Sequence, residues 1–474
     1  LQPYQRIFFS YQPHYITASA YSLTMNRAAN LAAYEKKKLQ LIASLQHQPG
    51  TNIRLVKDTS NLFRKREPMH GPGLNVRAFN KVINVDSENG FAEVEGMTSY
   101  ADLTCECLKH GVMPTVVPQL KSITIGGAVT GIGIESSSFK YGLVHETVQE
   151  MDILLGDGTT LTCTPENEHQ RLFFGFPNSY GTLGYALKLK IKVVPVKPYV
   201  RLTHIRHKDA AAYFADLEYR CKQNIDFIDG TIFGPDEYYL TVGEFTDSVP
   251  YTSDYTYKNI YYRSIRERDS DYLKVEDYVW RWDTDWFWCS QYIFADKPIV
   301  RRFLGPKRLN SVTYTKIMRW NRKYNIAYYL DLLQGFHSEA VIQDVEIPLD
   351  RCSDFLDFYF NSIKFMPVWV CPIRPLKQNA RFSLYPMDPE KLYVNFGFWN
   401  VIKSREKMGP GHYNRLVEKK VRELGGMKSL YSEAYYPPEQ FWDIYNKDEY
   451  FFLKSRYDPE RKLMDLYAKC VQRQ

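Results

Sequence analysis

Residues 124–142 constrain the fold more than any other stretch, because the thirteen residues 126–138 within them combine four glycines with a run of three serines. Gly126, Gly127, Gly131 and Gly133 remove side chains from a short backbone segment, and the serines follow at 136–138. Glycine tolerates positive φ and close approach, so consecutive backbone N–H groups can converge on one anion. A structural turn would account for two of these glycines but not for the whole stretch. We therefore expect a loop that binds a pyrophosphate through its backbone, with the serine hydroxyls as further donors.

The spacing of this loop excludes two other phosphate-binding motifs. It has no Gly-Lys-Ser/Thr ending, and no third glycine follows at the spacing of the dinucleotide-binding fold. The flanking residues predict strands at 81–85, 91–94, 148–155, 160–163 and 185–194, with a hairpin turn at 156–159. A helix is expected to open over 96–103 and to end at Gly111.

This order of elements resembles the FAD-binding domain of the p-cresol methylhydroxylase/vanillyl-alcohol oxidase superfamily. Residues 133–143 and 157–158 closely resemble the Δ24-sterol reductases of that superfamily, and so do the more distant segments 341–349, 367–372, 392–394, 430–431, 435 and 439–442. Residues 118–121 and 145–152 look more like bacterial relatives that reduce a methylene branch on a fatty acyl chain. The resemblance covers roughly residues 50–470.

The resemblance implies an α+β fold: a PCMH-type FAD-binding domain of two α/β subdomains, with an α+β substrate cap built on an antiparallel sheet. Prolines at 195 and 198 mark the exit from the first domain, and cap strands are expected at 341–349, 366–373 and 392–398. We expect a helical segment at 1–45, the FAD-binding domain at 46–198, the cap at 199–430 and a helical segment at 431–474 that returns to the FAD-binding domain.

The cofactor implied by the resemblance is non-covalent FAD. Superfamily members with a covalent flavin usually carry a histidine in the first loop or a cysteine after the second, and residues 57–63 contain neither. Lys57 and Arg64 could face phosphate or the surface. The residues expected to bind FAD are Ser60, Asn61, Thr124, Ile125, Gly126, Gly127, Gly131, Ile132, Gly133, Ile134, Glu135, Ser136, Gly181 and Gly184.

The function implied is reduction of an isolated C=C bond in a lipid, with NADPH as an external reductant. An isolated alkene accepts hydride poorly, so an acid inside an apolar pocket must protonate one carbon while reduced flavin delivers hydride to the other. Burial keeps such an acid protonated. Asp344, before an apolar strand, is the first candidate, and Tyr393 and Tyr435 are the next. The alternatives are an alkylglycerone-phosphate-synthase-like transferase and a hydroxy-acid or sugar oxidase.

Aromatic residues crowd the segment 278–288, where four of the eight tryptophans fall within nine residues. Such side chains suit an apolar pocket, a peripheral membrane contact or an aromatic core. Basic residues at 301–302 and 307–308 would suit anionic headgroups.

Composition excludes several other classes of function. The net charge of +7 is spread widely, which disfavours nucleic acid as a partner. Neither the eight cysteines nor the ten histidines show metal-ligand spacing, so we expect no metal and reduced, cytoplasmic thiols. We find no apolar run long enough to span a bilayer and no signal-peptide pattern. The expectation is a cytoplasmic protein that is soluble or peripheral to a membrane.

Overall fold

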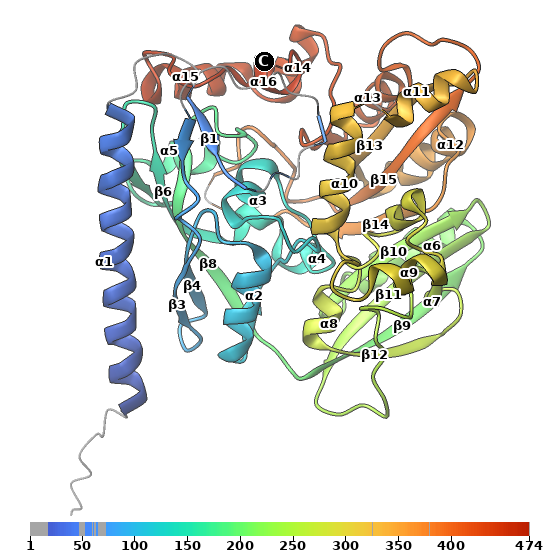
Figure 1. The fold of residues 1–474 in the computed structure, drawn as a ribbon, viewed down its shortest axis with the longest axis horizontal. Helices are drawn as coiled ribbons and strands as arrows, with labels where there is room; N and C mark the ends of the chain where they lie inside the picture. The colour runs from blue at the N-terminus through green and yellow to red at the C-terminus, as the bar shows by residue number, and fades with distance from the viewer. Residues whose placement is uncertain are drawn as a thin grey trace, which may run out of the picture.

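The protein folds into two lobes, each built around one β-sheet (Figure 1). The computed structural model describes residues 18–46, 53–58, 60, 63–64, 73–324, 326–378 and 380–473. We call the part up to residue 195 the N-terminal lobe and residues 199–428 the cap lobe. Mixed helices and largely antiparallel sheets confirm the predicted α+β class.

The N-terminal lobe contains a sheet of order β3-β4-β8-β6-β7, with β5 paired to β8. Its strands are β3 Val82–Asp86, β4 Phe91–Glu95, β5 Val112–Pro114, β6 Val148–Leu154, β7 Thr160–Cys163 and β8 Tyr185–Pro195. A separate parallel pair joins β1 Arg54–Val56 to β2 Gly73–Asn75. Its helices after α1 are α2 Tyr100–Lys109, α3 Ile125–Gly131, α4 Ser138–Tyr141 and α5 Gln170–Gly175. The strands and the helix predicted between residues 81 and 194 are confirmed. Most of their observed ends lie within two residues of the predicted ends.

Helix α1, Ala18–Gln46, lies against the N-terminal lobe (Figure 1). The hydroxyl of Tyr34 donates to Asp152 Oδ2 at 2.8 Å, and Arg27 Nε forms an ion pair with Glu93 Oε2 at 2.6 Å. The buried side chains of Leu41 and Leu45 join a small apolar cluster beneath the helix. These contacts explain why a helix forms here, in the part of the chain where a helical segment at 1–45 was predicted.

The cap lobe contains an eight-stranded sheet of order β12-β9-β11-β10-β14-β15-β13-β16. The strands are β9 Tyr199–His207, β10 Phe227–Gly234, β11 Glu237–Thr246, β12 Ser270–Lys274, β13 His337–Pro348, β14 Val368–Ile373, β15 Tyr393–Ser404 and β16 Met427–Lys428. Its helices are α6 Ala210–Arg220, α7 Tyr261–Ser264, α8 Val275–Val279, α9 Pro298–Leu304, α10 Ser311–Tyr324, α11 Ile326–Leu333, α12 Cys352–Ser362 and α13 His412–Glu423. Every strand pair in this sheet is antiparallel, as predicted for the cap.

The last helices, α14 Pro438–Ile444, α15 Lys447–Tyr457 and α16 Leu466–Cys470, contact the N-terminal lobe. Lys454 makes buried polar contacts there. Its Nζ donates to the carbonyl oxygens of Thr182 at 2.8 Å and Leu463 at 2.7 Å, and it forms an ion pair with Asp458 at 2.6 Å. The C-terminal helices are therefore fastened to the loop that precedes β8.

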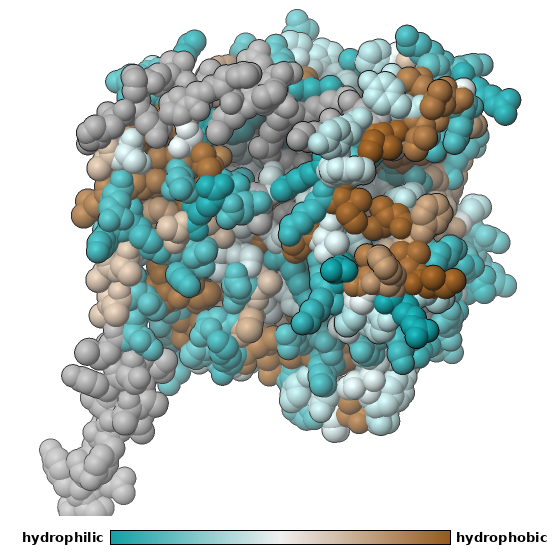
Figure 2. All heavy atoms as spheres, in the orientation of Figure 1, coloured by the Kyte–Doolittle hydropathy of each residue, from teal (hydrophilic) through white to brown (hydrophobic). Residues whose placement is uncertain are grey.

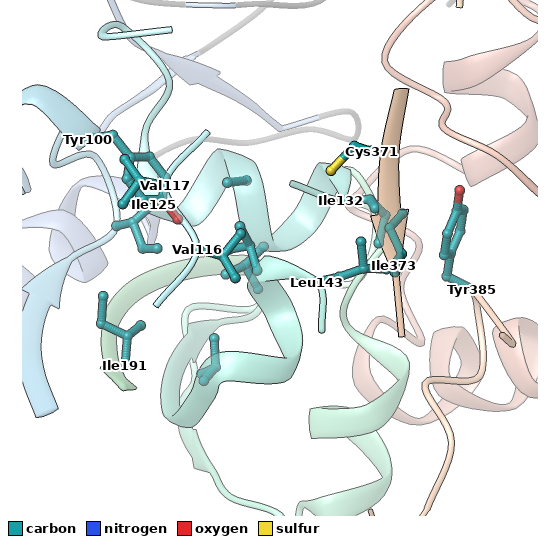
Figure 3. Close-up of a cluster of buried hydrophobic side chains, with 14 of the residues drawn as sticks. Tyr100, Val116, Val117, Ile125, Ile132, Leu143, Ile191, Cys371, Ile373 and Tyr385 are labelled. Atoms are coloured by element: carbon teal, nitrogen blue, oxygen red, sulfur yellow. The ribbon is translucent and has the colours of Figure 1, made fainter. Parts of the chain in front are cut away.

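One apolar cluster runs through both lobes. Figure 3 shows part of it, with Ile132 and Leu143 of the N-terminal lobe beside Ile373 of β14 in the cap lobe. The glycine-rich loop therefore lies against the middle of the cap sheet.

The aromatic segment 278–288 belongs to this core. Tyr278, Trp280, Trp282 and Trp288 are all buried, and Trp282 stacks on Phe287 at a ring distance of 4.9 Å. The prediction that this segment could contact a membrane is therefore wrong, because its side chains are packed inside the cap. Within the described residues, no helix has the length and apolar character needed to cross a bilayer.

Candidate functional site

The glycine-rich loop presents one open face. Thr124 caps helix α3 by accepting a hydrogen bond from the N–H of Gly127, and Gly127 is exposed. Thr130 and Gly131, one helical turn further on, are half-buried on the same side, and Ile134 after the end of the helix is half-buried as well. The N–H groups of residues 132–134 find no acceptor among the described residues. Consecutive unpaired N–H groups beside an open glycine face form a cradle for an anion.

Within residues 124–134 the positive backbone dihedral belongs to Ile132, with φ of 62°, and not to a glycine. This corrects the expectation that Gly131 or Gly133 supplies φ > 0. These two glycines are needed for space instead. A Cβ on Gly133 would lie 2.6 Å from Val144 Cγ2 and 3.1 Å from Pro118 Cγ, and one on Gly131 would lie 3.3 Å from the Tyr180 ring. A β-branched residue at φ > 0 is strained, and such strain is concentrated at functional sites.

The serines after the loop face the protein interior. Ser136 is fully buried, and its hydroxyl donates to Glu135 Oε1 at 2.7 Å and lies 2.9 Å from the Tyr278 hydroxyl. Glu135 in turn faces Arg281, whose guanidinium binds Asp229 at 2.7 Å. This corrects the expectation that the serine hydroxyls point at phosphate. Glu135 and Ser136 instead connect the loop to the cap lobe.

The remaining predicted residues near the loop are packing positions. Ile125 and Gly126 are buried, and the N–H of Gly126 donates to the carbonyl of Gly96 at 2.9 Å. Gly184 has φ of 141° and sits where a Cβ would lie 2.6 Å from Ile153 Cγ2.

A strained loop at residues 178–181 supports the cradle from the other side. Asn178, Tyr180 and Gly181 all have positive φ, at 63°, 50° and 77°. The hydroxyl of Tyr180 donates to the carbonyl of Gly131 at 3.0 Å. The guanidinium of Arg64 lies over the Tyr180 ring, 4.7 Å from its centroid. The predicted Gly181 therefore belongs to a loop that contacts the cradle through Tyr180.

The first loop contributes Phe63 and Arg64. Arg64 is only 1% exposed and donates to the carbonyl of Leu430, so the surface placement considered for it is wrong. The carbonyl of Ser60 accepts a hydrogen bond from Arg319 of α10 at 2.7 Å. Asn61 lies outside the described residues.

Asp344 lies in the middle of the cap sheet, on β13 and opposite Gly397 of β15. Asn395 Nδ2 donates to Asp344 Oδ1 at 3.0 Å, and the Tyr431 hydroxyl is also hydrogen-bonded to the carboxyl group. Gly397 makes room for the group, since a Cβ there would lie 2.6 Å from Asp344 Oδ1. Burial raises the pKa of Asp344 to about 6, against the lowering effect of both hydrogen bonds. The result is a carboxyl group able to hold a proton near neutral pH.

A second carboxyl group, Glu346, was not predicted. It lies two residues further along the same face of β13 and is fully buried. The Tyr385 hydroxyl donates to Oε2, while Oε1 has no hydrogen-bond partner among the described residues. Burial first, and then the nearby Asp344 charge, raise the pKa of Glu346 to about 8. The only sequence signal was an acidic residue between Val345 and Ile347 in an otherwise apolar run.

Neither predicted tyrosine hydroxyl bonds to Asp344. The Tyr393 hydroxyl accepts a hydrogen bond from the N–H of Asp388 at 3.1 Å, four residues along β15 from Gly397. The Tyr435 hydroxyl donates to Glu433 Oε2 at 2.5 Å, and its ring packs against Gly411. Tyr431 occupies the position expected of them. Its motif was noted in the sequence, but nothing there showed that Tyr431 rather than Tyr435 would reach the carboxyl group.

Aromatic rings surround Tyr431. Its hydroxyl accepts a hydrogen bond from Trp399 Nε1 at 2.8 Å, and its ring contacts Phe63 edge-on at 5.7 Å. Phe63 in turn packs on Trp286 at 5.6 Å. We call Phe63, Trp286, Trp399 and Tyr431 the aromatic wall. It gives Asp344 apolar surroundings on the side of the first loop.

A cavity of about 260 Å³ lies between the lobes, lined on one side by residues 143–146 and on the other by residues of the segment 375–389. His145 lines it, and burial lowers the pKa of this histidine to about 3, so the ring is neutral. Glu146 accepts hydrogen bonds from the N–H groups of Leu143 at 2.6 Å and Leu376 at 2.7 Å. Tyr385 borders the cavity and links it to Glu346.

Comparison with known proteins identifies the class first. Residues 30–164 match the family described as FAD binding domain, which contains the whole cradle. This match agrees with the prediction that the glycine-rich loop binds the pyrophosphate of FAD. The chain therefore carries an FAD-binding domain.

Relatives extend the similarity to the cap lobe. The chain is 28% identical to the mouse (Mus musculus) Delta(24)-sterol reductase over 410 residues, which covers 82% of this chain and 75% of the mouse protein. It is 25% identical to the Arabidopsis thaliana Delta(24)-sterol reductase over 429 residues, 82% of this chain and 75% of that protein. Cytokinin dehydrogenase 10 of Oryza sativa subsp. japonica is 26% identical over 155 residues, covering 32% of this chain and 28% of that protein. The predicted resemblance to sterol reductases is confirmed.

The residues present fit FAD. The unpaired N–H groups of residues 132–134 suit the pyrophosphate, and the open face at Gly127 and Gly131 leaves its backbone accessible. The buried Arg64 adds positive charge behind Tyr180. No group of three or more metal-ligating side chains occurs within the described residues.

Proposed function

We propose that this protein is an FAD-dependent oxidoreductase that reduces an isolated C=C bond of a lipid. The bond is the Δ24 bond of a sterol side chain or the methylene branch of a fatty acyl chain, and NADPH is the external reductant. One observation supports this reaction above all: a carboxyl group with a pKa of about 6 lies in the cap sheet beside the aromatic wall, to which the N-terminal lobe contributes Phe63. Similarity to sterol reductases over both lobes favours it over the transferase and oxidase alternatives.

Bound FAD would supply the hydride, and the chain supplies the proton. Asp344 holds that proton, and Asn395 and Tyr431 orient its carboxyl group by hydrogen bonds. The aromatic wall excludes water and provides an apolar contact for a hydrocarbon substrate. An acid with a pKa near the working pH is the most effective donor, because it is partly protonated and still gives up its proton readily.

Glu346 is proposed as a reserve of protons. With a pKa of about 8, it is protonated at neutral pH, when most Asp344 groups have lost their proton. Asn395 lies opposite Glu346 in the strand register and donates to Asp344, so one amide borders both carboxyl groups. Tyr385 connects Glu346 to the cavity between the lobes.

A reducing compartment is part of the proposal. None of the eight cysteines forms a disulfide, and six of them are buried, which agrees with a cytoplasmic protein.

The experiment is anaerobic reduction of the purified yellow protein with NADPH, followed by a single addition of lipid. A sterol with a Δ24 bond and a methylene-branched fatty acyl lipid form the two arms, and their saturated counterparts are the controls. We expect one alkene to restore the oxidised flavin spectrum while neither saturated lipid does. Failure of both alkenes with fully reduced protein would contradict the proposal.

A further inference from the structure

Exposed apolar side chains are concentrated in residues 292–333, which contain helices α9, α10 and α11. This segment holds eleven of the eighteen large hydrophobic side chains that are exposed in the described residues. Ile299 and Phe303 are 84% and 82% exposed, one turn apart on α9, and Leu333 on α11 is 84% exposed. The others are Tyr292, Phe294, Val312, Trp320, Tyr324, Tyr328, Tyr329 and Leu330. We call this set the apolar face, and Figure 2 shows hydrophobic residues gathered on this side of the cap lobe with hydrophilic ones between them.

The same segment is strongly basic. Residues 292–333 contain nine Lys and Arg residues but only two Asp, so their formal net charge equals that of the whole chain, +7. Both aspartates are buried and paired: Asp296 with Arg263 at 2.8 Å and Asp331 with Lys403 at 2.6 Å. Arg302, Lys307, Arg308 and Lys316 are exposed beside the apolar side chains. The surface therefore offers hydrocarbon contact and positive charge together.

The apolar face adjoins the aromatic wall. Tyr314 on the inner side of α10 stacks on Trp286 at 6.4 Å with the rings 16° apart, and its hydroxyl donates to the carbonyl of Thr284 at 2.7 Å. Arg319 on the same helix binds the carbonyl of Ser60 in the first loop. From Trp286 the ring contacts continue through Phe63 to Tyr431, the partner of Asp344. Helix α10 thus separates an exposed apolar surface from the half-buried reaction centre.

We propose that the apolar face docks on an anionic lipid bilayer. Surfaces that lie in a membrane interface have a characteristic composition. They combine Tyr and Trp with Leu, Ile and Phe, and they carry exposed Lys and Arg beside these apolar side chains. A second copy of this chain would fit less well, since a symmetric contact through this face would bring like charges together. Docking would place the outer side of α10 in the headgroup region, next to the aromatic wall. The docking itself does not depend on the proposed reaction, whereas delivery of substrate through this side rests on it.

The test measures binding of the FAD-loaded protein to sedimented vesicles, without substrate. One vesicle type is phosphatidylcholine alone, and the other contains about one-third phosphatidylglycerol. Ile299→Ser with Phe303→Ser removes two side chains that are more than four-fifths exposed, so the fold is preserved. The matched control is Leu39→Ser with Tyr219→Ser, at 65% and 61% exposure on other surfaces. Lys307→Ser with Arg308→Ser removes charge, with Lys407→Ser and Lys419→Ser as its control on exposed cap positions.

We expect wild type to bind the anionic vesicles and to be released by salt. The apolar double variant should bind roughly a hundredfold more weakly, and the basic double variant about tenfold more weakly, while both controls bind like wild type. Absence of vesicle binding by wild type would overturn the proposal. Equal loss in the control variants would also overturn it, and so would a wild-type oligomer in solution that the Ile299→Ser/Phe303→Ser variant dissociates.

A second readout separates docking from chemistry. Reduced wild type and the apolar variant are each mixed with alkene lipid in detergent and with the same lipid in anionic vesicles. We expect the variant to be slower only with vesicles. If wild type binds vesicles but oxidises its flavin in neither medium, the proposed reaction fails while the docking surface stands.

Discussion

The anion cradle in the N-terminal lobe and the carboxyl centre in the cap lobe are built in opposite ways. The cradle uses backbone N–H groups of three consecutive residues, 132–134. The carboxyl centre uses side chains from segments far apart in the chain, with Asp344 held by Asn395 and Tyr431. A backbone site needs space and a fixed conformation, so it depends on glycines. A side-chain site needs a protonation state, so it depends on burial and hydrogen-bond partners.

The largest expected effect tests the cradle. Gly133→Val should abolish FAD retention, because Val144 Cγ2 and Pro118 Cγ already lie within 3.1 Å of the position of an added Cβ. Absorbance of the purified variant at the flavin bands measures this. Gly409→Val is the matched control, since Gly409 is exposed and nothing lies within 4 Å of its added Cβ. A folded Gly133→Val protein with full FAD content would contradict our placement of the cradle.

Next in size is the loss expected from Asp344→Asn. Asparagine keeps the shape of the side chain but cannot deliver a proton, so oxidation of the reduced flavin by substrate should slow about 10²–10⁴-fold. FAD content and reduction by NADPH should stay normal, because the cradle lies on the other lobe. Asp350→Asn, at an exposed position after β13, is the control. Normal substrate oxidation in the Asp344 variant would exclude this residue as the donor.

The pH dependence of the same step identifies which carboxyl group donates. Burial raises the pKa of Asp344 to about 6, so this group carries its proton below that pH and loses it above. The rate should therefore be constant at low pH and fall about tenfold per pH unit above 6. A fall that begins near 8 instead would assign the proton to Glu346, whose pKa is raised to about 8. Stopped-flow reoxidation over pH 5 to 9 (roughly the range of protein stability) measures the profile.

A smaller effect is expected from Tyr431→Phe. Its hydrogen bond lowers the pKa of Asp344, so its removal should raise that pKa and move the break in the pH profile upward. Because the carboxyl group also loses an orienting partner, we expect the rate at low pH, where Asp344 is fully protonated, to fall about tenfold. Tyr435→Phe is a matched control, because its hydroxyl donates to Glu433. If Tyr435→Phe alone slowed the reaction, our assignment of the two tyrosines would be reversed.

The smallest effect is expected from Ser136→Ala. Its hydroxyl binds Glu135 and Tyr278, so FAD content should not change, while the free energy of unfolding should fall by about 1 kcal/mol. Urea titration measures the free energy of unfolding, and flavin absorbance measures the FAD content. Loss of FAD from this variant would restore the serine hydroxyls as pyrophosphate donors.

The difference between the two sites also explains what could be predicted from sequence. The cradle was found because glycine spacing is local, and strands such as β6 and β7 were found because alternation and a turn signal are local too. The direction of Ser136 was missed because its partner Tyr278 lies far along the chain. The positive φ of Ile132 was missed because a β-branched residue ordinarily avoids that conformation.

The carboxyl centre shows the opposite limit. Asp344 was selected because it precedes an apolar run in the sequence. Its partners could not be selected in this way, because strand pairing places Asn395 near it and Tyr431 belongs to a separate segment. The choice between Tyr431 and Tyr435 depends on how the chain leaves β16, which no local pattern encodes. The aromatic segment 278–288 was ambiguous for the same reason, because composition does not distinguish a core from a surface.

Lys454 has a consequence for how the protein is made. This residue fastens the loop at 178–184 through the carbonyl of Thr182, and that loop supports the cradle through Tyr180. The ribosome synthesises residue 454 after both lobes, so the cradle lacks one of its supports until the segment that contains Lys454 has been made. Chains that stop early would expose a cradle of reduced affinity. Uptake of the flavin would then report that the chain extends past residue 454, and cofactor content would separate such molecules from shorter fragments.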